Sequence, residues 1–328
     1  MLPKSDCDST DSLRSPEMRT EVSRGAAPCG PGLPRWLKRR VPKGNANHYT
    51  ARLMAELNLA TVCDHARCPN RMECYARHTA TFLLLGSVCT RRCRFCGVSK
   101  GRPAPPEFDE PQRVAEAARR LGLRHVVLTC VTRDDLHDGG AGHFVRTIEA
   151  VRRATGAKIE VLPSDFRGNL EAVDLLLSAE PDVYNHNAET VPRLFPLVRG
   201  PQANYRRTLE MFRHIRRRRP TMPLKTGLML GLGESDDELL DTLVDLHQAG
   251  CRLLTLGQYL RPSLDQMPVA RYVSPEAFER WKRRAEQIGY AHVAAGPFVR
   301  SSYHAAEMVG ESLSSIDSTS ATAWPGRT

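Results

Sequence analysis

Six cysteines between residues 63 and 96 constrain what this chain can fold into more than any other feature. They form two groups of three, with the spacings C-x4-C-x5-C and C-x3-C-x2-C: Cys63, Cys68 and Cys74, then Cys89, Cys93 and Cys96. A cysteine-rich window in a protein that is not secreted is typical of metal binding rather than of disulfides. Groups of three, not four, indicate two metal centres that each need one ligand other than cysteine.

The composition is that of a globular protein in the cytoplasm. The chain has 328 residues, 41% hydrophobic and 26% charged, which suits one large α/β domain or two small ones. No apolar run approaches the roughly 18 residues of a membrane span, and no apolar segment follows a basic start. Residues 1–34 hold five acidic residues, unlike an acid-poor transit peptide. We therefore expect a cytoplasmic protein.

The net charge of +10 indicates a basic surface. Such a surface attracts acidic proteins or nucleic acids, but it also occurs on proteins that bind neither. Aromatic residues make up 6% of the chain and do not gather among the arginines, so a nucleic-acid-binding module is not favoured. The run Arg216–Arg219 precedes Pro220 at the end of a predicted helix, where cations stabilise the helix dipole.

The chain divides into four predicted segments. Residues 1–34 are rich in Ser, Asp, Pro and Gly and form a disordered leader. Residues 35–78 form an N-terminal extension that carries the first cysteine group. Residues 79–296 form the main domain, and residues 297–328 form a C-terminal extension with a disordered tail.

Short apolar runs alternate with amphipathic patterns in the main domain, which predicts parallel βαβ units. The six predicted strands are 81–85, 125–128, 158–162, 182–184, 224–230 and 253–257. One helix is indicated by apolar residues spaced i, i+3, i+4 and i+7: Val114, Ala117, Ala118 and Leu121. A capping box of Ser235 and Glu238 predicts a helix over 236–249. The expected fold is α/β, a TIM-like partial (β/α)6 barrel with N- and C-terminal extensions.

The second cysteine group directly follows the first predicted strand. Three thiolates in so short a loop can hold three corners of a 4Fe–4S cube and leave one iron open to a small molecule. A structural zinc site is the alternative, but zinc prefers C-x2–4-C pairs in closed tetrahedral shells. The spacing, with Phe95 before the last cysteine, resembles the radical S-adenosylmethionine enzymes. In that superfamily the open iron chelates the cofactor, and one electron yields a 5′-deoxyadenosyl radical.

The first group suggests an auxiliary cluster, and with it the chain resembles the lipoyl synthase family. The matching stretches cover about Pro34 to Glu307: CDHARCPNRMEC, TATFLLLGSVCTRRCRFC, TCVTRDDLHDGG, LPSDFRG, NHNAETVPRLF, KTGLMLGLGE, LGQYLRPS, RYVSPEAF and GPFVRSSYHA. The segment LDQMPVARY after LRPS lacks the basic residues often seen there. Other radical enzymes with a second cluster, such as methylthiotransferases or biotin-type sulfur inserters, arrange their auxiliary ligands differently.

The resemblance implies an activity and a set of ligands. The enzyme would insert two sulfur atoms, at C6 and C8, into a protein-bound octanoyl-lysine to give the lipoyl group, with sulfur donated by the auxiliary 4Fe–4S cluster. Its cofactors would be two 4Fe–4S clusters and S-adenosyl-L-methionine. The implied ligands are Cys89, Cys93 and Cys96 for the radical cluster, and Cys63, Cys68, Cys74 and Ser302 for the auxiliary one.

Ser302 and Arg300 are the implied catalytic residues. A hard serine oxygen holds iron weakly in a thiolate site, which suits a cluster that is consumed. Polar residues near the predicted strands are candidates for binding S-adenosylmethionine: Thr129, Asp134, Asn187, Glu189 and Lys225. Each of the five would serve equally well in a structural ion pair or cap.

The implied partners are octanoylated lipoyl carrier domains, namely the glycine cleavage H protein and the 2-oxoacid dehydrogenase E2 subunits. An electron donor such as ferredoxin or flavodoxin and an iron–sulfur carrier protein are also expected. Neither nucleic acid nor a membrane is expected, and the chain is expected to be a monomer. Lipoyl carriers tend to be acidic, so the basic surface could steer their docking.

Overall fold

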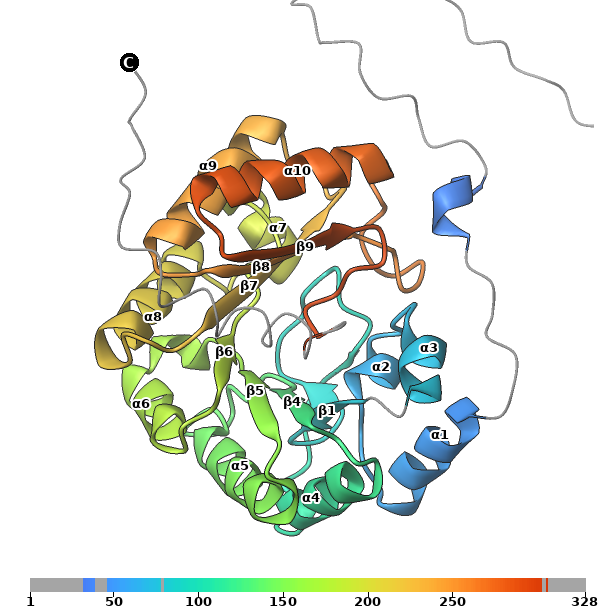
Figure 1. Ribbon diagram of the computed structural model, residues 1–328, viewed down its shortest axis with the longest axis vertical. Helices are drawn as coiled ribbons and strands as arrows, with labels where there is room; N and C mark the ends of the chain where they lie inside the picture. Colours follow the sequence, from blue (N-terminus) through green and yellow to red (C-terminus); the bar gives the residue numbers. More distant parts are fainter. Residues whose placement is uncertain (1–31, 39–45, 78–79, 303–304, 306–328) are drawn as a thin grey trace, which may run out of the picture.

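The structure is a computed structural model that describes residues 32–38, 46–77, 80–302 and 305. Most of the predicted leader and the predicted tail lie outside these residues. The described part of the chain is dominated by one sheet with helices around it, and a group of short helices precedes the first strand (Figure 1).

Seven parallel strands form the sheet in the order β1-β4-β5-β6-β7-β8-β9. Their bounds are β1 Thr81–Leu84, β4 His125–Cys130, β5 Lys158–Leu162, β6 Val183–Asn185, β7 Leu224–Leu230, β8 Leu253–Gln258 and β9 His292–Gly296. Every neighbouring pair is parallel. The strands curve around a common centre (Figure 1), and among the described residues β9 does not pair with β1, so the barrel is partial and open.

Six of these strands match the six predicted strands to within two residues at each end, which confirms the predicted α/β partial barrel. The seventh, β9, was not predicted. Its sequence, HVAAG, has small side chains and no alternating pattern, so little in it favours a strand. Pairing with β8, from Leu253↔His292 to Gly257↔Gly296, is what makes this segment a strand.

Helices cover the outside of the sheet (Figure 1). Their bounds are α4 Glu110–Arg120, α5 Ala141–Thr155, α6 Leu170–Ser178, α8 Tyr205–Arg218, α9 Asp236–Gln248 and α10 Pro275–Ile288. The short helix α7 Phe195–Arg199 lies instead at the second cysteine loop, where Val198 O accepts from Arg94 N at 2.8 Å. The 3-10 turns are η2 Phe166–Gly168 and η3 Pro192–Leu194. The predicted capping box is present, because Ser235 and Glu238 each accept from the other's backbone N–H. The predicted basic run ends α8, as expected for its helix dipole.

The N-terminal extension meets the edge strand β1 through the segment around the short helix α2 (Val62–His65). It contains η1 Arg35–Leu37, α1 Ala46–Glu56, α2 Val62–His65 and α3 Arg71–Ala76. Thr50 on α1 donates to the carbonyl of the buried Tyr75 on α3, at 2.9 Å. Between α1 and α2, Thr61 forms an antiparallel bridge with Phe82 of β1. The extension is therefore joined to the barrel where the sheet is open.

A two-stranded parallel pair closes the base of the second cysteine loop. It joins β2 Val88–Cys89 to β3 Ser99–Lys100, and Gly101 N donates to Cys89 O at 3.0 Å. The loop between these short strands carries Cys93 and Cys96. Its two ends are thus held together before any metal binds.

A buried ion pair occupies the barrel interior and involves one of the predicted cofactor contacts. Lys225 of β7 donates to both oxygens of Glu160 on β5, at 3.0 and 3.2 Å, and neither side chain is exposed. Burial alone would raise the pKa of Glu160, but Lys225, His125 and Asn185 outweigh it, so this pKa lies below its usual range. Lys225 is the second residue of β7, far from the strand's C-terminal end. This ion pair gives Lys225 a structural role, and its binding of S-adenosylmethionine stays a prediction.

Removing one partner of this ion pair should destabilise the protein strongly. Lys225→Met leaves a buried carboxylate without its counter-charge, and we expect the free energy of unfolding to fall by about 3–5 kcal/mol. The double variant Glu160→Gln, Lys225→Met should recover most of that loss. Anaerobic denaturant unfolding measures both. Unchanged stability together with a selective loss of affinity for S-adenosylmethionine would contradict the structural role.

Candidate active site

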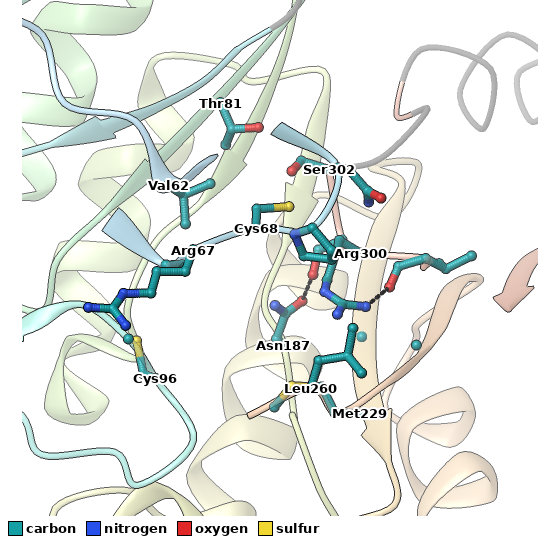
Figure 2. A pocket seen from close by; sticks show the side chains of 18 of the residues that line it. Val62, Arg67, Cys68, Thr81, Cys96, Asn187, Met229, Leu260, Arg300 and Ser302 are labelled. Atoms are coloured by element: carbon teal, nitrogen blue, oxygen red, sulfur yellow. Dashed lines mark hydrogen bonds between the residues drawn. The ribbon is translucent and has the colours of Figure 1, made fainter. Parts of the chain in front are cut away.

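A cavity of about 300 Å³ opens at the C-terminal ends of the strands. Its lining combines the N-terminal extension, the second cysteine loop, strands β7 and β8 and the segment after β9. The predicted site residues that line it are Cys63, Cys68, Cys74, Cys96, Asn187, Glu189, Arg300 and Ser302. In Figure 2, Cys68, Arg300 and Ser302 lie on one side of the view and Cys96 lies apart from them. Residues from both cysteine groups thus share one cavity.

Two short helices position the first cysteine group. Thr61 caps α2 by accepting from Asp64 N at 3.2 Å, which places Cys63 inside the helix. Cys68 N donates to Cys63 O at 3.1 Å in the turn that follows. Cys74 lies on α3, and its N–H donates to Asn70 O at 2.9 Å. Backbone hydrogen bonds therefore place all three thiols at the same cavity.

Burial acts on three of the predicted ligand thiols, those of Cys63, Cys93 and Cys96. It raises the pKa of Cys63 to about 12 and that of Cys96 to about 12, and it also raises the pKa of Cys93. A thiol must lose its proton to ligate iron, so metal binding at these sites releases protons. Until then burial keeps Cys63 and Cys96 protonated at neutral pH.

A buried arginine that the sequence reasoning missed supports the second cysteine loop. Arg91, between Cys89 and Cys93, donates to Asp134 at 2.7 and 2.9 Å and to Asp165 at 2.6 Å. Its side chain is 2% exposed, and the ion pairs hold the pKa of Asp165 well below its usual range despite its burial. These bonds join the loop to the segments after β4 and β5. The only signal in the sequence was a basic residue between two of the predicted ligand cysteines.

Two predicted contacts of S-adenosylmethionine lie elsewhere. Thr129 is buried and donates to Leu162 O at 2.8 Å, and Asp134 is engaged by Arg91. Neither residue lines the cavity. Each makes the kind of structural hydrogen bond or ion pair that was the alternative to cofactor binding. Their predicted role in binding the cofactor therefore has no support from this cavity.

Asn187 and Glu189 do line the cavity, and the backbone there is strained. Glu189 has a φ of 70°, a region that non-glycine residues rarely adopt. Its N–H donates to Gly227 O and its carbonyl accepts from Met229 N, both at 2.9 Å. Asn187 Nδ2 donates to Glu189 Oε1 at 3.1 Å. Burial raises the pKa of this carboxyl, and Arg199 partly opposes the shift.

The segment after β9 completes the cavity. Ser301 Oγ donates to Asn187 Oδ1 at 2.8 Å, and Asn70 Nδ2 donates to Phe298 O at 2.7 Å. Arg300 Nη1 donates to Val299 O at 2.6 Å, and burial lowers the pKa of its guanidinium. Ser301 is thus bound to the barrel through Asn187, and Ser302 belongs to the same lining.

The donors around the cavity suit clusters better than a single ion. Within the described part of the chain, no three His, Cys, Asp or Glu side chains are grouped closely enough to hold one metal ion. A cubane cluster binds each thiolate at a different iron, so its ligands do not need to converge on one point. Two such clusters fit these donors. One would take the three cysteines and the serine at the cavity, and the other would take the second cysteine loop, whose Cys96 also lines the cavity.

Comparison with known proteins agrees with this geometry. The model of the Radical SAM superfamily matches residues 83–246, and that of the N-terminal domain of lipoyl synthase matches residues 6–68. Methylornithine synthase has a similar fold, with a TM-score of 0.51 at 13% identity over 65% of this chain and 69% of that chain. Fold and cysteine loop together define a radical S-adenosylmethionine enzyme.

The most informative relatives narrow the class. Lipoyl synthase of Rhodopirellula baltica is 58% identical over 84% of this chain and 88% of its own length. Lipoyl synthase of Caldanaerobacter subterraneus is 51% identical over 83% of this chain and 95% of its own length. The chain belongs to the lipoyl synthase family, as its sequence motifs predicted. None of the described helices is long and apolar enough to cross a membrane.

A buried histidine next to the site gives a pH dependence that can be measured. His186 is 2% exposed, and burial lowers its pKa from 6.5 to about 4. Above pH 6.5 the ring is neutral in the folded and unfolded chain, so it does not affect stability. Between pH 6.5 and about 4 only the unfolded chain takes up the proton, and stability falls as pH falls. The full loss is about 3 kcal/mol.

The variant His186→Gln removes this titration. We expect the wild type to lose about 2 kcal/mol more stability than the variant between pH 7 and pH 5. Anaerobic denaturant unfolding of both proteins at the two pH values measures the difference. An equal loss in the two proteins would show that His186 is not buried in its neutral form.

Proposed function

We propose that this chain is a lipoyl synthase that inserts sulfur at C6 and C8 of an octanoyl chain on a lysine of a carrier protein. The observation that supports it best is a single cavity lined at once by Cys96, by all three cysteines of the first group and by Ser302. In the proposal, Cys89, Cys93 and Cys96 hold one 4Fe–4S cluster, and Cys63, Cys68, Cys74 and Ser302 hold the auxiliary one. When bound, these clusters and S-adenosylmethionine supply hydrogen abstraction from unactivated carbon and the sulfur that replaces it.

The chain's own residues position what reacts. The buried Arg91 holds the loop of Cys89, Cys93 and Cys96 against two carboxylates, which keeps the radical source in a fixed place. A displacement of about 1 Å at a reacting centre can cost about 100-fold in rate. Ion pairs as well buried as these resist such displacement.

Apolar side chains form the part of the cavity that suits an acyl chain. They are Val62, Ala66, Leu162, Leu228, Met229, Leu260 and Val299. They exclude water from the place where a reactive carbon forms, and they offer no polar group that would react with it. The same lining holds Cys96 and the cysteines of the first group, so an acyl chain in this cavity would lie near residues of both groups.

Glu189 and Asn187 are the polar residues best placed to bind S-adenosylmethionine. Both line the cavity, and the Glu189 carboxyl lies within its low-dielectric interior. A carboxylate there accepts hydrogen bonds from ribose hydroxyls. Arg300 lies on the same lining and is proposed to act on the auxiliary cluster or its sulfur.

The proposed partners follow from the activity. Octanoylated lipoyl carrier domains, such as the glycine cleavage H protein and the 2-oxoacid dehydrogenase E2 subunits, supply the substrate. A ferredoxin or flavodoxin supplies electrons, and an iron–sulfur carrier protein restores the auxiliary cluster. The proposed place of action is the cytoplasm.

Mass spectrometry of the acyl chain tests this function. Protein reconstituted anaerobically should hold about eight irons, as two four-iron clusters require. With S-adenosylmethionine, a reductant and an octanoyl-lysyl peptide, it should add two sulfur atoms per octanoyl group. Cys93→Ala should stop formation of 5′-deoxyadenosine. Cys68→Ala should still form it but transfer no sulfur.

The variant Cys251→Ala serves as the control, because that thiol is buried in the core away from the cavity. It should keep both steps. If the wild type forms 5′-deoxyadenosine but adds no sulfur to the octanoyl group, the proposed substrate is wrong. If protein with about eight irons does neither, the proposed enzyme class fails.

A further inference from the structure

The segment after β9 crosses β8 at a residue that has no side chain. A Cβ on Gly257 would lie 2.1 Å from Val299 O and 3.0 Å from Arg300 Nη1. The first of these contacts is with backbone, which cannot rotate away as a side-chain tip can. A larger residue at 257 would therefore have to displace the segment itself.

A second glycine faces the same segment from β7. A Cβ on Gly227 would lie 2.6 Å from Thr255 Oγ1, 2.9 Å from Asn187 Oδ1 and 3.1 Å from Ser301 Oγ. The space that it would fill is the space of the hydrogen bond between Asn187 and Ser301. Both glycines line the cavity, so they lie at the site and not merely near it.

Backbone conformation does not explain either glycine. Neither has a positive φ, the conformation that other residues avoid. A glycine inside a strand weakens it and commonly marks a close approach of another backbone. Here the close approach is that of Val299 and its neighbours, so the requirement at 227 and 257 is for space.

The neighbouring strand provides a direct contrast. Gly296 of β9 pairs with Gly257 in the sheet. A Cβ on Gly296 would lie 3.5 Å from Val299 Cγ2, which is an ordinary van der Waals contact. Two paired glycines thus face the same residue, but only one of them is needed to make room.

We propose that Gly257 and Gly227 are positioning residues for the auxiliary-cluster site. Their missing side chains let Val299–Ser301 lie across β7 and β8, and this placement sets Ser302 at the cavity that Cys63, Cys68 and Cys74 share. Hydrogen bonds from Asn70 to Phe298 and from Ser301 to Asn187 fix the two ends of the segment. The inference rests on the proposed function, in which Ser302 completes that cluster.

Gly257→Ala and its matched control Gly296→Ala test the inference. After anaerobic reconstitution, Gly257→Ala should hold about four irons per chain, whereas Gly296→Ala should hold about eight. The electron paramagnetic resonance spectrum of reduced Gly257→Ala should lack the second cluster. That variant should still form 5′-deoxyadenosine, and its sulfur insertion should fall at least tenfold.

Ser301→Ala is a gentler variant, because it removes one hydrogen bond and adds no bulk. Its auxiliary cluster should lose iron to a chelator several-fold faster than that of the wild type, with no change in the radical cluster. If Gly257→Ala keeps about eight irons with wild-type spectra, the positioning role is wrong.

Two further outcomes are separable. If circular dichroism shows that Gly257→Ala does not fold, Gly227→Ala and Ser301→Ala decide: a folded protein with a lost or labile auxiliary cluster supports the inference, and a normal cluster in both overturns it. If wild type and Gly296→Ala both bind eight irons but add no sulfur to octanoyl peptide, the proposed function fails. In that case the iron contents of Gly257→Ala and Gly296→Ala still test whether Gly257 positions the segment.

Discussion

A partial barrel leaves the edges of its first and last strands open, and the site depends on how this chain uses the opening. The N-terminal extension binds the edge strand β1 through the bridge between Thr61 and Phe82. The chain leaving β9 turns back across the strand ends, and Asn70 donates to Phe298 O between the two segments. The edge of β1, which would otherwise invite pairing with another chain, is instead covered by the extension that carries the predicted ligands Cys63, Cys68 and Cys74.

This arrangement explains why one cavity receives residues from both ends of the chain. Cys63, Cys68 and Cys74 arrive from one side of the opening and Ser302 from the other, while Cys96 comes from the loop after β1. The buried ion pairs of Arg91 with Asp134 and Asp165 fix that loop to the segments after β4 and β5. A reaction that needs a radical source and a sulfur source near one acyl chain requires such a convergence.

The local sequence pattern predicted most of the strands and several residues of the cavity. The features that it did not predict have physical causes. Apolar runs identified six strands, because buried parallel strands carry a strong hydrophobic signal. β9 was missed because its small residues are held by pairing with β8 and not by their own propensity. The spacing of the cysteines and the sequence RSSY identified Cys63, Cys68, Cys74, Cys96 and Ser302, which line one cavity, whereas Cys89 and Cys93 are not among its lining residues. Their role as ligands stays a prediction.

The polar residues were harder to predict, because their partners lie far away in the sequence. Lys225 lies near the N-terminal end of its strand and pairs with Glu160, a partner that its local sequence does not indicate. Arg91 was missed because its carboxylate partners come from two other loops. Gly257 carried no signal at all, since what it accommodates is the backbone of Val299. Only the assembled fold brings such pairs together.

Anomalous X-ray scattering from iron tests the central claim most directly. Crystals of the anaerobically reconstituted protein should show two iron clusters facing one cavity. One should lie in the loop of Cys89, Cys93 and Cys96, and the other should be bounded by Cys63, Cys68, Cys74 and Ser302. A single cluster, or a second cluster whose ligands lie away from this cavity, would contradict the account.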